Sequence, residues 1–354
     1  MLFCLLAPAI FWLGIEFVLL ACWFLGLSFH GERPPWLVRP HPYRLFQYIP
    51  GSTSLGRTCY HNSFGLRDRE LPAPKPPGTI RLVCLGGSTT YGPWATTNTH
   101  TYPAHLERLL RERYAKSSFA VEVINAGQPL YSSLETLILF QTLLLDFSPD
   151  VVILQLSIND AFVGSKFRGF AGDFSRARHT MSPPRPALWE YSPLLTVAFA
   201  KVTGPFNPYQ PNLSVTLMNL THNRWEDGLS PAAPAQEERA RESADTLERN
   251  VLSFIAVARG NGIVPVLATD TYARGGDFFD VVGTACNDRL RAVATSYTVV
   301  LVDFARDMPW DSQLFYDTCH LRDAPGTFDR KAGIFADASI RAGVIEQVAH
   351  RAQE

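Results

Sequence analysis

From residue 79 onward, short apolar runs alternate with stretches in which apolar and charged residues recur at helical spacing. A short apolar run that ends in glycine or another turn signal is typical of a strand buried on both faces. Strands that alternate with helices form a parallel sheet with helices on both sides, so the fold class predicted is three-layer α/β/α with about five strands. The predicted strands are 80–85, 121–124, 151–156, 263–268 and 298–302, and the predicted helices are 102–114, 134–145, 236–259, 279–297 and 328–352.

The first 30 residues are far more apolar than the rest, because 24 of them are hydrophobic and Glu16 is their only formal charge. As a helix, residues 2–29 would exceed the roughly 30 Å hydrocarbon core of a bilayer, so we expect an uncleaved transmembrane anchor. A cleaved signal peptide is the alternative, but no basic residue precedes the apolar run and no clear cleavage site follows it. A charge in mid-span costs roughly 2.5 to 3.5 kcal/mol, so Glu16 is expected to be protonated or paired, for example with a partner helix in the membrane.

The rest of the chain is expected to lie outside the cytoplasm, with a single pass through the membrane. Arg33, Arg39 and Arg44 follow the apolar segment, and by the positive-inside rule alone they would favour a cytoplasmic domain. Only three charges enter the rule here, and large domains are translocated largely independently of such charges, so the rule is weak evidence for this chain.

Three regions are expected in the chain: the anchor at 1–29, a Pro-rich lead-in at 30–78, and an α/β domain at 79–354. The domain is interrupted at 161–235, where no regular pattern is present. This insert begins directly after a strand end, so we predict a lid or cap over the functional site; an exposed, partly disordered insert is the alternative. The aromatic residues predicted to line the pocket are Phe162, Phe167, Phe170, Trp189, Tyr191 and Trp225.

Composition excludes several classes of protein. The 32 basic residues are balanced by 33 acidic ones, which argues against a nucleic-acid partner. The six cysteines form no closely spaced metal motif, so no metal is expected, although Cys59, Cys286 and Cys319 could include one disulfide in an oxidising compartment. Neither a phosphate loop nor a dinucleotide fingerprint is present, and no cofactor is expected.

Polar residues follow the predicted strand ends, where ligands bind in such sheets. Ser88 comes after two glycines at the end of the first strand, Gly127 follows the second, and Asn159 follows the third. Asp317 stands three residues before His320, beyond the fifth strand. The order Gly86-Gly87-Ser88-Thr89-Thr90 lacks the last glycine of an α/β-hydrolase nucleophile elbow, which excludes that fold.

With these residues the chain resembles the SGNH (GDSL-type) hydrolase superfamily. The matching segments are LGGSTTYG with Ser88, INAGQP with Gly127, SIND with Asn159, and DTCHL with Asp317 and His320. The lead-in 62–68 is similar to a segment of membrane-anchored bacterial members that have an N-terminal transmembrane segment. The chain departs from the family pattern at Gly87, Thr89 and Ser157, and in the segment 322–326 after the histidine.

The resemblance implies a flavodoxin-like SGNH fold and a serine ester hydrolase, acting as an acylesterase or deacetylase. Ser88 would be the nucleophile, His320 its general base and Asp317 the group that orients the histidine. The oxyanion hole would consist of the backbone N–H groups of Ser88 and Gly127 and the side chain of Asn159.

Other interpretations of the same residues stay open. An O-acyltransferase on a glycan or lipid would use the same acyl-enzyme, and a catalytically idle, membrane-tethered binding module would keep only the scaffold. The substrate class is broad: an acylated small molecule, lipid or glycan. Asp160 is expected to hold its loop through backbone hydrogen bonds, and Cys319 to be a neighbour of His320 and not a second nucleophile.

Overall fold

The computed structural model describes most of the chain. The described residues are 2–24, 38–41, 43–44, 46–54, 59–72, 75–166, 170–174, 192, 194–195 and 232–351.

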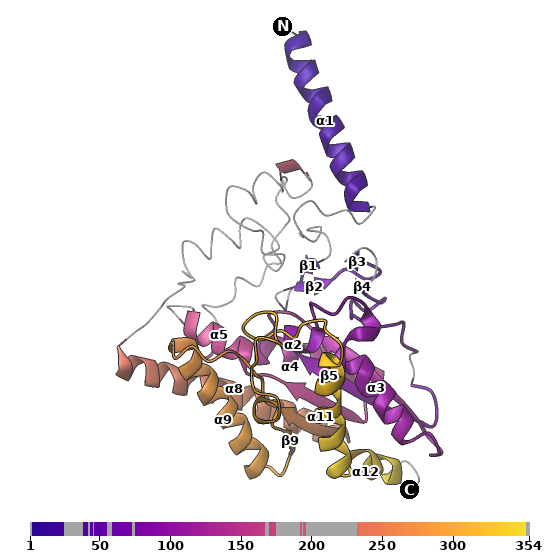
Figure 1. The fold of residues 1–354 in the computed structure, drawn as a ribbon, viewed down its shortest axis with the longest axis vertical. Helices are drawn as coiled ribbons and strands as arrows, with labels where there is room; N and C mark the ends of the chain where they lie inside the picture. The colour runs from indigo at the N-terminus through magenta and orange to yellow at the C-terminus, as the bar shows by residue number, and fades with distance from the viewer. Residues whose placement is uncertain are drawn as a thin grey trace.

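A five-stranded parallel sheet forms the centre of the domain (Figure 1). Its strand order is β6-β5-β7-β8-β9, which is the flavodoxin-like order: β5, the first strand of this sheet along the chain, lies second from one edge. The predicted strands are therefore confirmed. They are β5 (Thr79–Gly86), β6 (Ala120–Gly127), β7 (Val151–Gln155), β8 (Val264–Ala268) and β9 (Val300–Val302).

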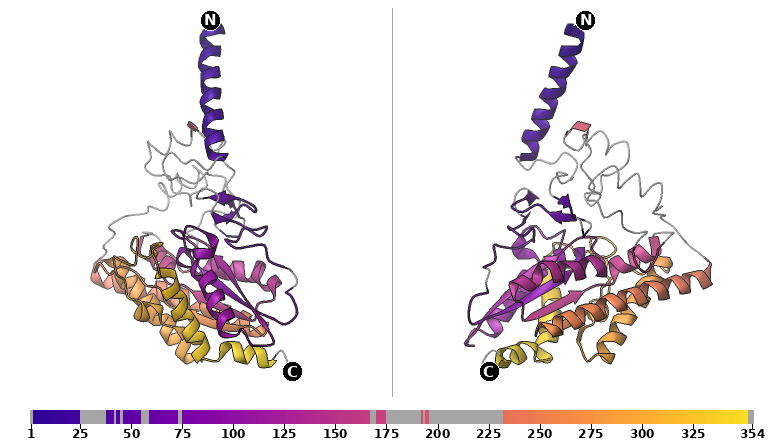
Figure 2. Two further views of the ribbon diagram at one scale, coloured as in Figure 1. Left: turned by 45° about the vertical axis from the view of Figure 1, so that its right-hand side comes forward. Right: turned by 180° about the vertical axis from the view of Figure 1, so that it is seen from behind.

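Helices cover both faces of this sheet, as the two further views show (Figure 2). Alternate residues of one strand enter different cores: Val83 of β5 packs with residues of α4, α8 and α9, and Leu82 packs with residues of α3, α11 and α12. This alternation confirms the three-layer α/β/α class. The bounds are α3 (Tyr102–Arg113), α4 (Ser133–Thr142), α5 (Ile158–Lys166), α8 (Ala233–Gly260), α9 (Phe278–Ser296), α11 (Thr327–Arg341) and α12 (Val344–Arg351).

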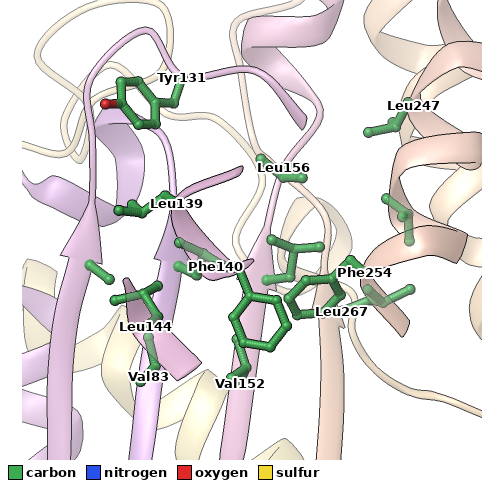
Figure 3. Packing of buried hydrophobic residues seen from close by; sticks show 14 of the residues in the cluster. Val83, Tyr131, Leu139, Phe140, Leu144, Val152, Leu156, Leu247, Phe254 and Leu267 are labelled. Atoms are coloured by element: carbon green, nitrogen blue, oxygen red, sulfur yellow. The ribbon is translucent and has the colours of Figure 1, made fainter. Parts of the chain in front are cut away.

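The core beneath α4 and α8 is built around two phenylalanines (Figure 3). The rings of Phe140 and Phe254 lie 4.8 Å apart and cover Val152 of β7 and Leu267 of β8. Full burial of one such side chain contributes about 1.5–3 kcal/mol. This core fixes the helices on one face of the sheet.

Local sequence signals determine where helices begin and end. The Ser132 hydroxyl and the Glu135 side chain form a capping box at the start of α4. The predicted single helix 328–352 is instead two helices, because Gly343 adopts a left-handed conformation with φ +63° between α11 and α12. Three of the α-helices that the structure describes lie outside the predicted helix ranges: α2 (Ser88–Tyr91), α5 and α10 (Phe304–Asp307).

The lead-in contains two antiparallel strand pairs. These are β1 (Val38–Pro40) with β2 (Phe46–Tyr48), and β3 (Thr53–Ser54) with β4 (Cys59–Tyr60). After them, the buried guanidinium of Arg67 donates to the carbonyls of Gly92 and Ala95, the latter at 2.6 Å. Asp68 accepts a hydrogen bond from the Asn125 N–H at 2.7 Å. The lead-in is thus fastened to the segments that follow β5 and to β6.

The N-terminal segment forms helix α1 (Leu2–Phe24), which contains Pro8. No helix in the part of the chain that the structure describes is both long and apolar enough to cross a membrane. The predicted anchor at 2–29 is therefore not supported, and the extracytoplasmic location stays a prediction. The Glu16 carboxylate accepts hydrogen bonds from the Ser192 hydroxyl and, at 3.0 Å, from the Leu194 N–H, so its partners within this chain belong to the insert. The partner helix expected at Glu16 stays a prediction.

Most of the predicted lid lies outside the described residues, including Phe167, Trp189, Tyr191 and Trp225. Helix α5 ends at Lys166, and α8 begins at Ala233. Phe170 is buried between the Phe174 ring and the Arg239 guanidinium of α8, so it packs on the domain. The three cysteines considered for a disulfide, Cys59, Cys286 and Cys319, are free. Cys286 is a buried residue of α9.

Candidate active site

Residues after β5 and β7 meet where the strand order reverses. β5 pairs with β6 on one side and with β7 on the other, and ligands bind at such a point in open α/β sheets. Ser88 is the first residue of α2, directly after β5, and Asn159 lies in the first turn of α5, after β7. A Cβ at Gly87 would lie 2.5 Å from Asn159 Nδ2, so the amide rests against the backbone next to Ser88.

The structure brings Ser88, His320 and Asp317 together, although 232 positions separate the serine from the histidine. His320 Nε2 lies 2.7 Å from Ser88 Oγ. Its Nδ1 lies 2.7 Å from Asp317 Oδ2 and 2.9 Å from Oδ1. A carboxylate only accepts hydrogen bonds, so Nδ1 carries the proton and Nε2 accepts the serine hydroxyl.

A short closed loop holds the acid and the base. Phe315 and Leu321 pair as an isolated antiparallel bridge, and the Tyr316 N–H donates to the His320 carbonyl at 2.7 Å. Asp317 Oδ1 also accepts the backbone N–H groups of Cys319 and His320, each at 2.9 Å. The carboxylate is therefore fixed by its own loop as well as by the imidazole.

The charge of Asp317 is stabilised in place. Partial burial by itself raises the pKa of this carboxyl, but the hydrogen bond and charge of His320, together with the two backbone N–H groups, hold its pKa well below the usual range. Asp317 therefore stays ionised near neutral pH.

The Asn159 amide is oriented by a turn that sequence reasoning did not single out. Its Nδ2 donates to the Tyr131 carbonyl at 2.8 Å, and the amide keeps a second N–H. The residue before Tyr131, Leu130, adopts φ +61°, which is unusual for a residue other than glycine. Leucine gives no sequence signal for such a conformation, so this strained turn beside the site could not be found from the sequence.

Gly127 is held by contacts on both its N–H and its Cα. Its N–H donates to Asn125 Oδ1 at 3.1 Å, so this donor is already engaged. A Cβ at Gly127 would lie 2.2 Å from Tyr91 N and 2.7 Å from the Thr90 carbonyl carbon. The glycine is needed for the close approach of β6 to α2, and its predicted part in the oxyanion hole stays a prediction.

Asp160 holds two helices together, in agreement with the structural role expected for it. Its carboxyl accepts the Ser133 hydroxyl at 2.6 Å and the Ser133 N–H at 3.0 Å. Complete burial raises the pKa of Asp160 to about 7, against the effect of the Ser133 hydrogen bonds. The contact joins the start of α4 to the start of α5.

Three side chains of the site could be considered as metal ligands. Asp317, Cys319 and His320 each place one donor atom within 4.8 Å of the others. Both nitrogens of His320, however, already have partners in Ser88 and Asp317. Burial and the Asp317 charge raise the pKa of the Cys319 thiol well above its usual value, whereas metals bind the thiolate. The arrangement fits proton transfer better than metal binding, and the neutral thiol is a poor nucleophile.

A cavity of about 10 Å³ adjoins the serine and the histidine. Asp270 and Lys331, which sequence reasoning did not select, line it together with Ser88 and His320. Lys331 belongs to the amphipathic helix α11, and a lysine in such a pattern is usually on the exposed side. The sequence therefore gave no sign of its burial.

The fold and this arrangement of serine, histidine and aspartate are together typical of serine hydrolases with a flavodoxin-like sheet. The family model of the GDSL-like lipase/acylhydrolase family matches residues 84–324. The chain belongs to this family. No curated protein matches the sequence.

Solved structures with a similar chain course include a putative lipolytic protein of the G-D-S-L family from Desulfitobacterium hafniense, at 13% identity and TM-score 0.43, over 73% of this chain and 99% of that one. An acetylxylan esterase from Geobacillus stearothermophilus, solved as a catalytic mutant, matches at 13% identity and TM-score 0.43, over 74% and 93%. A GDSL-like lipase from Bacteroides thetaiotaomicron matches at 15% identity and TM-score 0.40, over 77% and 93%.

Proposed function

We propose that the protein is a serine ester hydrolase that works through an acyl-enzyme on Ser88. The observation that carries the proposal is the position of one imidazole: His320 Nε2 lies 2.7 Å from Ser88 Oγ while Nδ1 lies 2.7 Å from Asp317 Oδ2. A serine hydroxyl is a weak nucleophile until a base takes its proton, and this contact supplies the base.

In the first half of the reaction, Ser88 Oγ attacks the ester carbonyl carbon and its proton passes to His320 Nε2. The tetrahedral intermediate collapses, the bond to the alcohol oxygen breaks, and Nε2 returns the proton to that oxygen. In the second half, water attacks the acyl carbonyl and gives its proton to Nε2, which then returns it to Ser88 Oγ as the acid leaves. Asp317 holds the imidazole in one tautomer and stabilises the imidazolium.

The intermediate carries an oxyanion, and two donors beside the nucleophile are proposed to bind it. One is the Ser88 N–H, which lies in the first turn of α2 and has no partner within the helix. The other is the second N–H of the Asn159 amide, whose first N–H is bound to the Tyr131 carbonyl. Loss of one such donor raises the barrier by about 2.7–4 kcal/mol.

The substrate class we propose is an ester of a small molecule, lipid or glycan. An O-acyltransferase would form the same acyl-enzyme and replace water by an acceptor hydroxyl, so the two activities differ only in what attacks the intermediate. The two activities are distinguished by analysing the products formed from an ester substrate with and without an oligosaccharide as acceptor. Hydrolysis yields free acid in both mixtures, whereas transfer yields an acylated sugar only when the acceptor is present.

The proposal is tested by pre-steady-state hydrolysis of p-nitrophenyl esters by the full-length protein. The expected result is a burst of nitrophenol, about one equivalent per active site, followed by slower turnover. Ser88→Ala should remove the burst and the turnover. Turnover that is the same in Ser88→Ala as in the native protein would contradict the proposal.

A further inference from the structure

A buried lysine lies directly behind the turn that carries the nucleophile. Lys331 is 1% exposed, and its Nζ donates to the Thr89 carbonyl and to Gln155 Oε1, both at 2.8 Å. Aromatic rings surround the same nitrogen, with the ring centres of Tyr102 and Phe304 at 4.1 and 4.9 Å. A lysine is almost never buried unless its amine has partners, so these contacts define the place of the side chain.

The side chain of Thr89 is held as well as its carbonyl. Its hydroxyl donates to Asp270 Oδ1 at 3.0 Å, and Asp270 is itself 1% exposed. The second oxygen, Asp270 Oδ2, accepts the N–H of Ile158 at 3.3 Å, which is the first residue of α5. Thr89 therefore connects a buried amine with a buried carboxyl, and it directly follows Ser88 in the chain.

The turn needs such support because α2 has only four residues. An isolated helical turn is unstable, and its last carbonyl groups have no partner within the helix. Basic side chains stabilise these carbonyls at a helix C-terminus. A misplacement of the reacting atoms by 1 Å lowers the rate by about 100-fold.

We propose that Lys331 is a positioning residue for the reaction at Ser88: with Asp270 it fixes the carbonyl and the hydroxyl of Thr89 and so keeps the serine hydroxyl in line with His320. The inference rests on the proposed hydrolase function and extends it to a residue that does not touch the substrate. Burial lowers the pKa of Lys331 to about 7, against the opposing charge of Asp270. The two hydrogen bonds survive this titration, because a neutral amine still has two N–H donors for its two acceptors.

The first variant is Lys331→Met, which keeps the length of the side chain and removes its donors. Misplacement of the hydroxyl should lower kcat on p-nitrophenyl acetate and the second-order rate of inactivation by a fluorophosphonate, each by about 10- to 100-fold. The KM should stay within about twofold, since the lysine does not contact the substrate. Lys75→Met is the matched control, because Lys75 pairs with Asp150 near the opposite ends of the strands, and it should keep native values.

A second pair of variants tests the other half of the contact without changing the lysine. Thr89→Val removes the hydroxyl at nearly constant volume and should lower kcat, whereas Thr89→Ser keeps the donor and should stay close to the native rate. Thermal unfolding of each variant shows whether it is folded at the assay temperature.

A folded Lys331→Met variant with native kcat and native inactivation rate would overturn the proposal. If that variant does not fold, a native kcat in Thr89→Val would overturn it instead. A loss confined to melting temperature, with kcat unchanged, would show a structural role only and would also refute it. A native protein that neither reacts with the fluorophosphonate nor hydrolyses the ester would instead refute the proposed function, and the inference with it.

Discussion

Asp317→Asn changes one atom of the site and leaves its loop intact. Asp317 Oδ1 accepts the N–H groups of Cys319 and His320, and only an oxygen can do this. In the variant, the amide oxygen therefore takes the place of Oδ1, and the NH₂ group takes the place of Oδ2, 2.7 Å from His320 Nδ1. Two donors would then face each other, so the imidazole proton moves to Nε2.

With its proton on Nε2, His320 cannot accept the proton of Ser88. The comparable tautomer change in serine proteases lowers kcat by about 10⁴-fold, which corresponds to about 5 kcal/mol of barrier. We expect a loss of this size for Asp317→Asn in steady-state hydrolysis of p-nitrophenyl acetate. Because the pKa of Asp317 lies well below its usual range, the native carboxylate is ionised across the assay, and the loss should not vary from pH 6 to pH 9 by more than about tenfold.

The matched control is Asp311→Asn, since Asp311 is an exposed carboxylate in the same region of the chain. Among the residues that the structure describes, its side chain accepts one hydrogen bond, from the backbone N–H of Gln313. It should keep native kcat. A folded Asp317→Asn variant with kcat within about threefold of native would refute the tautomer argument, because that argument requires several kcal/mol.

Three further substitutions have outcomes that follow from contacts already described. Gly127→Ala would place a Cβ 2.2 Å from Tyr91 N, so the free energy of unfolding in urea should fall by about 3 kcal/mol. An unchanged free energy of unfolding would contradict the close approach of β6 to α2. Asn159→Ala should lower kcat by about 10²- to 10³-fold at nearly constant KM, and a change in KM alone would argue against an oxyanion donor. Burial raises the pKa of Asp160 from 3.8 to about 7, so the stability that its protonated form contributes is full below pH 4 and is lost as pH rises through 7. Asp160→Asn should therefore remove up to about 4 kcal/mol of the pH dependence of the unfolding free energy, measured by urea titration between pH 4 and pH 8. An unchanged dependence of the unfolding free energy on pH would show that Asp160 is not its source.

The sheet could be predicted because its signals are local. The apolar runs of β5 to β9 are short, buried on both faces and separated by amphipathic helices, so periodicity alone gives their order along the chain. The residues after the strand ends could also be selected, since the carboxyl ends of parallel strands share one edge of the sheet. Ser88, Asn159 and the pair Asp317 and His320 were all found in this way.

The remaining features depend on contacts between distant parts of the chain. Lys331 belongs to a helix whose pattern predicts an exposed lysine, and its burial arises only because α11 packs behind Thr89. Gly127 follows a strand like the other site residues, but the neighbouring Asn125 side chain takes its N–H. Ser157 adopts φ +148°, a conformation that favours glycine, and its hydroxyl is tied to Asn287 of α9 at 2.8 Å. Local sequence pattern contains none of these partners.

The central claim is that Ser88 is an activated nucleophile, and covalent labelling tests it most directly. The full-length protein is treated with a fluorophosphonate probe, digested, and analysed by mass spectrometry. The account predicts one adduct, on Ser88, that is absent from Ser88→Ala and forms far more slowly in Asp317→Asn. An unlabelled native protein, or an adduct on another residue that persists in Ser88→Ala, would contradict it.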